Sequence, residues 1–396
     1  MSKLKITDIK LIRCGRLSFF KVFTNEEEIT GIGECIVNYE PILKGYMKYL
    51  RDFLIGEDPF AIEKIWKKLY TRTFLFSKET MFSPIDNALW DIKGKKLGVP
   101  VYELLGGLYR DRVRVYTHLK GTWNTYPDEK SDRLYSVKWG SANSLKEIRN
   151  NALELVKEGY TAIKFDPFPL GIDGYHGYRR SEIRKAIEIV KTVYEAVPES
   201  VDIMIEAHRK FNASTAIRIG KILEEYDPMW YEEPVPTVDI DAMLKVRNHI
   251  SVPIAAGERL FSKKELKEYL EKGVFDIFMF DLSYVGGITE ARKMCAMAEA
   301  YQIKVSPHNP FGPVNMIASV HLSAATPSFL ILEDERFAPW AIKPCIKYEN
   351  GYIIVPDRPG FGVELDEEEI RKHQEKVDTG EYYTDAQNES IPSWDS

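Results

Sequence analysis

The stretch Asp202-Ile203-Met204-Ile205-Glu206-Ala207 is a short apolar run with an acid near its end, and it predicts a buried strand. After it, Ser214–Tyr226 repeats apolar residues at helical spacing, and Met229-Trp230-Tyr231-Glu232-Glu233-Pro234 is a second short apolar run. A strand, a helix and a strand in succession predict a βαβ unit and therefore a parallel sheet.

The same alternation extends over the middle of the chain, where it predicts a modified (β/α)₈ TIM-like barrel over residues 113–340. An open, doubly wound sheet is the competing α/β fold. It usually carries a glycine-rich phosphate turn after its first strand, and this sequence has none there. The predicted strands are Val113–Leu119, Ala162–Asp166, Asp202–Ala207, Met229–Pro234, Pro253–Glu258, Ile277–Leu282, Lys304–His308 and Phe329–Glu335.

The region before the barrel, residues 1–112, is predicted to be a separate α+β unit. Residues 4–36 alternate apolar and polar side chains, which predicts an antiparallel meander, whereas residues 41–100 follow helical periodicity. Within the helical part, Ser83-Pro84 predicts the start of a helix, because proline is favoured in a first helical turn.

The composition excludes several classes of protein. The 396 residues are 44% hydrophobic, which is too apolar for a disordered chain, and the net charge of −6 without a basic run argues against a nucleic-acid partner. No apolar run approaches the roughly 20 residues of a membrane helix, and the N-terminus is unlike a signal peptide. The four cysteines lack CxxC spacing, so we expect a reducing, cytoplasmic location.

Charged residues recur at the ends of the predicted strands, at intervals of 23 to 27 residues, which is about the length of one βα unit. Residues at the same end of successive barrel strands point into one mouth, and barrel enzymes carry out their chemistry there. These residues are Glu206, Glu232, Glu258, Asp281, His308 and Glu333.

Three of them, Glu206, Glu232 and Glu258, predict a metal site. Converging carboxylates repel one another, so that without a cation at least one of them takes up a proton. A set of oxygen donors alone favours Mg²⁺, or Mn²⁺, over zinc. In the alternative interpretation, each glutamate is a helix N-cap or a salt-bridge partner at a strand end.

Two histidines are candidates for proton transfer. His308 ends the strand that follows Asp281, and a carboxylate bonded to one imidazole nitrogen fixes the tautomer and raises the basicity of the other. We expect this pair to lie opposite the metal side. His208 comes two residues after Glu206 and shares its face if the strand persists that far. The two rings suggest an acid and a base on two faces of a substrate, although His308 could also be a satisfied core histidine.

Three further residues are candidates for substrate binding. Lys164 ends the second predicted strand and could neutralise a substrate carboxylate, or its ammonium could be solvated. Asp166 shares the face of Lys164 by strand alternation. His118 ends the first predicted strand, and a structural or loop role is supported as well as a binding role.

Several specific motifs occur along the chain. They are Gly31-Ile32-Gly33-Glu34, residues 85–95, residues 100–107, Tyr231-Glu232-Glu233-Pro234, Ala256-Gly257-Glu258-Arg259 and Gly286-Gly287-Ile288-Thr289-Glu290. With them the sequence resembles the enolase superfamily, specifically the acid-sugar dehydratases of its mandelate-racemase-like branch. The resemblance implies one Mg²⁺ and abstraction of a proton α to a carboxylate. It also implies a capping domain, built from residues 1–112 and completed by 341–396, and a homo-oligomer, often an octamer.

The segment Glu206-Ala207-His208-Arg209-Lys210-Phe211 is most similar to the galactonate and gluconate dehydratases. This similarity implies that His208 is the acid that expels the 3-hydroxyl, that His308 removes the C2 proton, and that Glu333 hydrogen-bonds a carboxylate oxygen of the substrate. The sequence departs from the family at two points. The first metal ligand is more often Asp than Glu, and Lys164-Phe165-Asp166 replaces the Lys-x-Lys of the racemases, which favours a single base.

The expected function is therefore Mg²⁺-dependent dehydration of D-gluconate or D-galactonate to a 2-keto-3-deoxy acid. A five-carbon acid, arabinonate or xylonate, remains open as the substrate, as does racemisation or epimerisation of an α-hydroxy acid. Two alternatives come from other classes: a non-catalytic sugar-acid binding protein, and a metal-binding barrel that hydrolyses an ester or phosphate. The second usually needs histidine ligands or a bridging carboxylated lysine, and a set of carboxylates alone disfavours it. Substrate choice is expected to depend on Arg13–Phe20, Arg72–Phe82, Gly121–Asn143 and Pro167–Arg179, the last of which carries His176.

Overall fold

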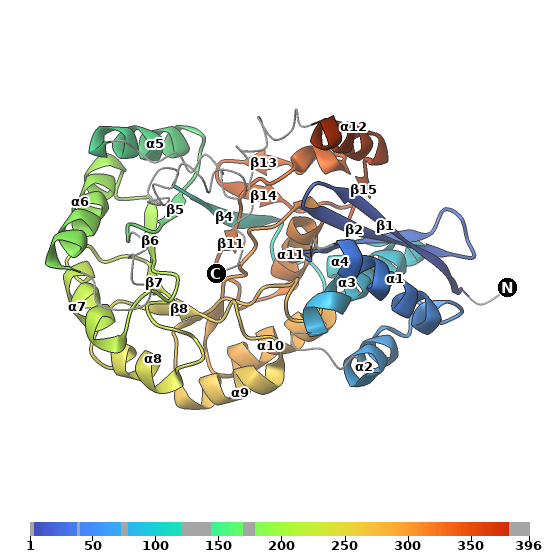
Figure 1. The fold of residues 1–396 in the computed structure, drawn as a ribbon, viewed down its shortest axis with the longest axis horizontal. Coiled ribbons are helices and arrows are strands. Elements are labelled where there is room, and N and C mark those ends of the chain that lie inside the picture. Colours follow the sequence, from blue (N-terminus) through green and yellow to red (C-terminus); the bar gives the residue numbers. More distant parts are fainter. Residues whose placement is uncertain (1–3, 38–39, 73–77, 120–143, 169–178, 380–396) are drawn as a thin grey trace.

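The computed structural model describes residues 4–37, 40–72, 78–119, 144–168 and 179–379. An antiparallel sheet with its own helices comes first, and a parallel sheet surrounded by helices follows (Figure 1). This arrangement confirms the predicted α/β fold with an N-terminal capping domain and a barrel-like parallel sheet. Gly121–Asn143 lies outside the described residues, as does most of Pro167–Arg179, including His176.

The cap, residues 6–104, begins with the predicted meander, in which β1 pairs with β2 and β2 with β3. Helix α3 packs so closely on β3 that a side chain at Gly31 or Gly33 would overlap the carbonyl oxygens of Ala88 or Pro84. The elements of the cap are β1 Ile6–Cys14, β2 Leu17–Thr24, β3 Thr30–Cys35, α1 Glu40–Leu54, α2 Ile62–Arg72, α3 Lys78–Leu97 and α4 Val101–Leu104.

The prediction that a helix starts at Ser83-Pro84 is wrong. Helix α3 begins at Lys78 and continues through Pro84, although proline cannot donate a helical hydrogen bond. Hydrogen bonds of Ser83 hold the helix at this point, one within the helix and one to the barrel. Ser83 Oγ donates to Glu79 O at 2.9 Å and accepts from Gly286 N of the barrel at 2.9 Å.

The parallel sheet consists of strands β4 to β11 in sequence order, and it contains all eight predicted strands, seven of them in shortened form. In the described part of the chain, one helix follows each strand up to β10. The elements are β4 Arg112–His118, α5 Leu145–Lys157, β5 Ala162–Phe165, α6 Arg180–Ala196, β6 Asp202–Glu206, α7 Ala213–Leu223, β7 Trp230–Glu232, α8 Ile240–Arg247, β8 Ile254–Ala256, α9 Lys263–Lys272, β9 Ile277–Phe278, α10 Ile288–Ala300, β10 Lys304–Val305, α11 Pro313–Ala325 and β11 Leu332–Glu333.

The sheet closes on itself, because β11 pairs in parallel with β4 and Val305 bridges to Phe329. Buried side chains fill the inside, so the barrel is a packed core and not a pore. Those inside are Tyr116, Ala162, Met204, Trp230, Ala255, Ile277, Met279 and Ile331. No helix in the described segments is both long and apolar enough to cross a membrane.

The C-terminal residues contact both the cap and the barrel. β14 (Tyr352–Ile354) pairs with β13 (Tyr348–Glu349) and adds antiparallel to β4. After the pair β12 (Ile342–Lys343) and β15 (Glu364–Leu365), α12 (Glu367–Thr379) lies against β1 of the cap (Figure 1). The division into residues 1–112, 113–340 and 341–396 stays a proposal.

Buried polar groups of the cap bind the N-termini of two barrel helices. Glu34, at the end of β3, accepts hydrogen bonds from Gly312 N at 2.7 Å and from Val314 N and Asn315 N at 3.1 Å each, at the start of α11. A carboxylate is favourable there because the first helical N–H groups have no partner within the helix. Burial nevertheless raises the pKa of Glu34 to about 7.

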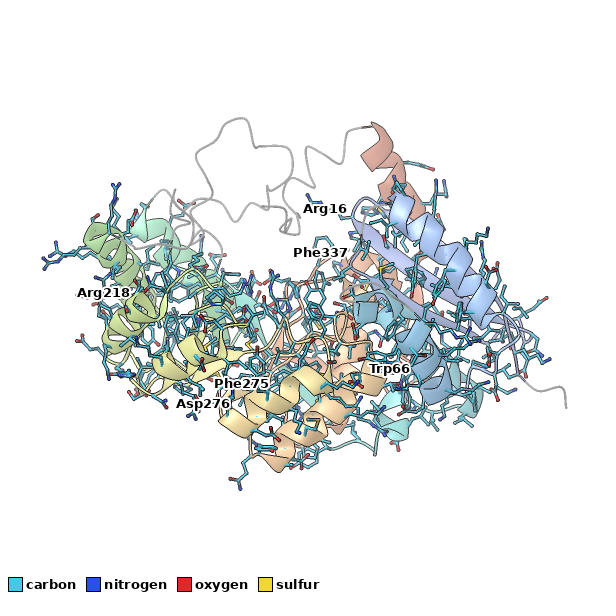
Figure 2. All side chains as sticks on the ribbon, turned by 60° about the horizontal axis from the view of Figure 1, so that its bottom comes forward. Arg16, Trp66, Arg218, Phe275, Asp276 and Phe337 are labelled. Atoms are coloured by element: carbon cyan, nitrogen blue, oxygen red, sulfur yellow. The ribbon has the colours of Figure 1, made fainter. Side chains whose placement is uncertain are left out.

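The start of α10 is bound in the same way. Asp86 accepts from Thr289 N at 2.9 Å, and the side chain of Asn87 accepts from Ile288 N at 3.2 Å. Next to them, Trp66 of α2 lies where the cap meets the barrel (Figure 2) and donates to Gly286 O at 2.9 Å. The cap is therefore fixed on the helices that flank β10.

Replacement of Glu34 by glutamine tests this connection. The amide NH₂ would face backbone N–H donors, and each buried donor left without an acceptor costs about 1–3 kcal/mol. We expect the free energy of unfolding, measured by urea denaturation, to fall by at least about 2 kcal/mol. Glu27→Gln changes an exposed glutamate and is the matched control. Equal urea midpoints for the two variants would contradict this account.

Candidate active site

Lys164 occupies the centre of the barrel mouth, surrounded by carboxylates. Its Nζ lies 2.8 Å from Glu232, 3.0 Å from Glu333 and 3.3 Å from Glu206, and all four side chains are buried. Burial alone would lower the pKa of Lys164, but Glu232 and Glu333 raise it well above its usual value. The lysine is therefore an ammonium ion held by buried acids, which excludes the solvated position that the sequence left open.

Glu206 and Glu232 are register partners at the ends of adjacent strands β6 and β7. Burial and the neighbouring Glu206 raise the pKa of Glu232 well above its usual range. Burial would also raise the pKa of Glu206, but His208 and Lys164 lower it. The positive charge of Lys164 therefore does not balance the negative charges of both Glu206 and Glu232.

Glu258 follows β8 and is held by a different cation. Arg209 contacts both Glu258 and Glu233, the second acid of the motif after β7. Burial would raise the pKa of Glu258, whereas His308 and Arg209 lower it. Neither Arg209 nor Glu233 was predicted as a site residue, because an Arg in a loop and a second Glu in a motif carry no signal of their own.

His308 and Asp281 meet as predicted. His308 Nδ1 lies 2.6 Å from Asp281 Oδ2, and the two residues form a parallel bridge between neighbouring segments of the barrel. However, His308 Nε2 lies 3.2 Å from Glu258, so the pair does not lie opposite all three predicted ligands. Burial would lower the pKa of His308, but Glu258, Glu333 and Asp281 raise it to about 9.

A second Asp–His pair lies on the other side of the mouth. His208 Nδ1 is 2.7 Å from Asp166 Oδ2, and Lys210 Nζ also contacts Asp166. The predicted strand does not continue as far as His208, because β6 ends at Glu206 and His208 has a left-handed φ of 45°. Strand alternation therefore does not place His208 on the face of Glu206. His208 instead stays beside Glu206 through its backbone N–H, which donates to Glu206 Oε1 at 2.7 Å.

His118 belongs to the site through β11. Its Nε2 lies 2.6 Å from Glu333 and 3.4 Å from Glu335. Ligand atoms of these three residues lie within 4.8 Å of one another, so they form a candidate metal group among the described residues. The short contact between His118 and Glu333 is already explained by a hydrogen bond. Glu335 was not predicted.

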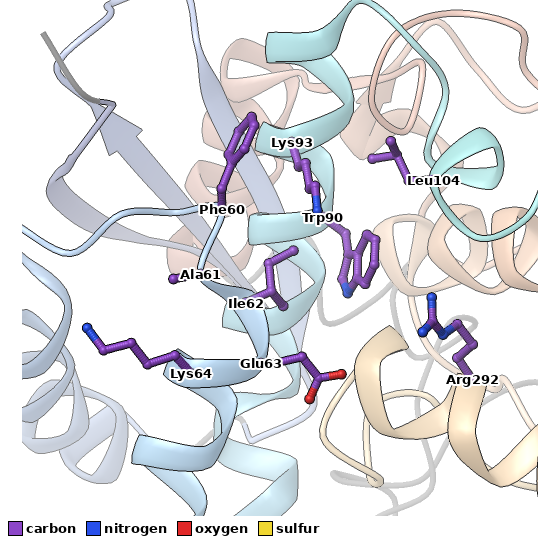
Figure 3. A pocket seen from close by; sticks show the side chains of 9 residues that line it. All are labelled: Phe60, Ala61, Ile62, Glu63, Lys64, Trp90, Lys93, Leu104 and Arg292. Atoms are coloured by element: carbon purple, nitrogen blue, oxygen red, sulfur yellow. The ribbon is translucent and has the colours of Figure 1, made fainter.

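A separate cavity of about 490 Å³ lies between the cap and the barrel (Figure 3). Phe60 and Trp90 of the cap line it together with Lys93 and with Arg292 of α10. None of the converging acids or histidines lines this cavity, so it is not part of the candidate active site.

Two family models match the chain. Residues 147–369 match the model described as Enolase C-terminal domain-like, and residues 13–106 match that of the Mandelate racemase / muconate lactonizing enzyme, N-terminal domain. The chain belongs to the mandelate racemase/muconate lactonizing enzyme family of the enolase superfamily. Members of this superfamily use a divalent metal ion.

Relatives of this family protein include named sugar-acid dehydratases. A D-gluconate dehydratase of Thermoproteus tenax is 37% identical over 365 residues, which cover 89% of this chain and 69% of the relative. A D-galactonate dehydratase of Ralstonia pickettii (strain 12J) is 34% identical over 379 residues, which cover 92% and 93%. A solved mandelate racemase/muconate lactonizing enzyme-like protein from Roseovarius sp. TM1035 has a TM-score of 0.82 at 33% identity and covers 93% of this chain and 95% of its own.

Replacement of Lys164 by methionine removes the cation at the centre of the acids. Breaking a buried ion pair by removing one partner typically costs about 3–5 kcal/mol, and we expect a loss of that size in the free energy of unfolding, measured in EDTA. Lys185→Met, in which an exposed lysine of α6 is replaced, should change it by less than about 0.5 kcal/mol. A Lys164 variant as stable as this control would show that the acids do not depend on the lysine.

Proposed function

We propose that the protein is a Mg²⁺-dependent dehydratase of a sugar acid, D-gluconate, D-galactonate or both, that yields a 2-keto-3-deoxy acid. The observation that carries this proposal is the pair of Asp–His contacts, Asp281 with His308 and Asp166 with His208, on two sides of one cluster of buried glutamates. Elimination of water needs a base at C2 and an acid at the 3-hydroxyl, and two separately held imidazoles fit these needs. The activities named for the relatives support the same reaction.

The metal ion would be held by Glu206, Glu232 and Glu258. Their side chains are all oxygen donors on or just after three consecutive strands, and each is at most 5% exposed. The raised pKa of Glu232, which burial and Glu206 cause, indicates a carboxylate cluster that lacks positive charge. These features suit Mg²⁺, or Mn²⁺ in its place. When bound, the ion supplies Lewis-acid stabilisation of negative charge on the substrate carboxylate.

His308 is the proposed base. Asp281 accepts its Nδ1–H, which leaves Nε2 as the nitrogen that takes the C2 proton. A base must be neutral, whereas Glu258, Glu333 and Asp281 raise the pKa of this ring to about 9 against the effect of burial. Engagement of Glu258 as a metal ligand would remove the strongest of these carboxylate effects and favour the neutral ring.

His208 is the proposed acid, and Lys164 and Glu333 are the proposed contacts of the substrate carboxylate. Lys164 contributes a positive charge at the centre of the mouth, and together with a bound Mg²⁺ it would favour binding of an anion. Glu333 accepts from Asn309 N at 2.8 Å and contacts His118, so its position is fixed from two sides. His118 is accordingly proposed to hold Glu333 and to contact substrate only at the edge of the site.

Each alternative function can be compared with the described contacts. A racemase of this family type would need a second base on the strand of Lys164, and Asp166 is already bonded to His208, Lys210 and Phe168 N. A non-catalytic sugar-acid binding protein would not need two histidines held by acids. Arabinonate and xylonate stay possible substrates, because none of the described contacts distinguishes five carbons from six.

A panel of sugar acids tests the proposed reaction. The panel contains D-gluconate, D-galactonate, D-arabinonate and D-xylonate, each incubated with the protein and Mg²⁺ and analysed by mass spectrometry. We expect loss of one water from at least one six-carbon acid. Turnover of the five-carbon acids alone would correct the substrate, and turnover of none would overturn the proposal.

Substitution of the two histidines separates the steps of the reaction. His308→Asn should abolish both C2-proton exchange in D₂O and water loss. His208→Asn should reduce water loss by about 10²–10⁴-fold while some C2 exchange continues, because proton-transfer groups contribute factors of that size. NMR of the recovered acid measures exchange, and a colorimetric keto-acid assay measures elimination. Near wild-type keto-acid formation by both variants would refute the assignment.

The metal assignment predicts a stabilising effect of Mg²⁺. An ion that binds only the folded protein raises its stability by about 2.7 kcal/mol at 100 times its Kd. We expect Mg²⁺ to raise the midpoint of thermal unfolding of the wild type, and to have little effect on Glu232→Gln. Glu199→Gln, a change at an exposed acid after α6, should respond like the wild type. An equal response of the Glu232 variant would place the ion elsewhere.

A further inference from the structure

Asp166 has both of its carboxylate oxygens engaged by the protein. Oδ1 accepts from Phe168 N at 2.9 Å, and Oδ2 accepts from His208 Nδ1 at 2.7 Å and from Lys210 Nζ. The side chain is 1% exposed. A carboxylate used in this way is poorly placed to bind a sugar hydroxyl, so the expected role of Asp166 in substrate binding does not explain its contacts.

The pair Asp166–His208 has the same local construction as the pair Asp281–His308. In each, Oδ1 accepts the backbone N–H two residues further on, from Phe168 at 2.9 Å or from Ser283 at 2.7 Å. In each, Oδ2 then lies within 2.7 Å of the Nδ1 atom of the histidine. The short turn fixes the carboxylate, and the fixed carboxylate sets the orientation of the ring.

The backbone of His208 adds a second constraint. Its φ of 45° lies in the left-handed region, which costs free energy for a residue other than glycine and persists only where the surroundings enforce it. Its N–H donates to Glu206 Oε1 at 2.7 Å, and the next residue, Arg209, is also left-handed at 62°. The backbone thus fixes the position from which the His208 side chain extends. Asp166 binds Nδ1 and leaves Nε2 available for the substrate.

Lys210 secures Asp166 in turn. It is 7% exposed, and its Nζ donates to Phe168 O at 2.6 Å as well as to Asp166. The lysine therefore joins the turn after β5 to the segment after β6. Three residues from the segments that follow β5 and β6, namely Asp166, His208 and Lys210, form one connected unit.

We propose that Asp166 is a positioning residue for His208, which holds Nδ1 so that Nε2 meets the leaving 3-hydroxyl. This proposal rests on the proposed dehydration. A displacement of about 1 Å from productive geometry can cost about 10²-fold in rate. Loss of Asp166 should therefore slow elimination and leave the C2-proton step, which His308 performs, largely intact.

The matched variants are Asp166→Asn and Asp281→Asn, compared in the Mg²⁺-loaded enzyme. Asp166→Asn should lower water loss by about 10²-fold and preserve C2 exchange in D₂O, so that the ratio of exchange to elimination rises by about the same factor. Asp281→Asn should lower exchange and elimination together. If Asp166→Asn lowers both in parallel, or neither, Asp166 is a structural residue and the proposal fails. If Asp166→Asn does not fold, Asp166→Glu replaces it, because this variant keeps the negative charge next to Lys210. The same rise in the ratio of C2 exchange to elimination is then expected of it.

A second measurement decides the proposal without a substrate. Acylation of histidines by diethyl pyrocarbonate, followed by peptide mass spectrometry, reports the reactivity of each ring. In Asp166→Asn, His208 should react several-fold faster than in the wild type while His308 is unchanged. An unchanged rate at His208 would show that Asp166 does not hold the ring. Absence of water loss from every sugar acid would by contrast refute the proposed function, and this result would leave the acylation rates to decide the role of Asp166.

Discussion

The convergence of buried carboxylates on one point is the constraint on which the site depends. Parallel barrel strands direct their ends into one mouth, and here Glu206, Glu232, Glu258 and Glu333 meet there with almost no access to water. Burial of like charges is unfavourable unless cations accompany them. Lys164 and Arg209 supply part of that charge, and the proposed Mg²⁺ supplies the rest. Metal binding then follows from the surplus negative charge of this cluster, whereas attraction of an anionic substrate would depend on Lys164 and the bound ion.

Buried acidic groups also fix the cap on the barrel. Glu34 and Asp86 place acidic groups at the N-termini of α11 and α10, where backbone N–H groups need acceptors. Helix α11 begins five residues after His308, at Pro313. The contact that holds the cap therefore also fixes the segment that follows the proposed base, so the cap contributes to the geometry of the site.

Much of the fold could be predicted because it depends on local patterns. Apolar runs of strand length, separated by helical periodicity, predicted every barrel strand, and their spacing predicted which acids share the mouth. Contacts that depend on backbone irregularity could not be predicted in this way. The left-handed His208 and the partnership of Asp166 with Lys210 arise only once β6 ends at Glu206. The helix through Pro84 was missed for a similar reason, since the hydrogen bond from Gly286 of the barrel to Ser83 is not visible in a local pattern. The octameric assembly and the cytoplasmic location stay predictions.

The most direct test of the central claim is a crystal structure of the protein soaked in Mn²⁺, with anomalous scattering recorded to locate the ion. The account predicts one anomalous peak bound by oxygens of Glu206, Glu232 and Glu258. A peak at His118, Glu333 and Glu335 instead, or no peak in the barrel mouth at Mn²⁺ concentrations that support turnover, would contradict it.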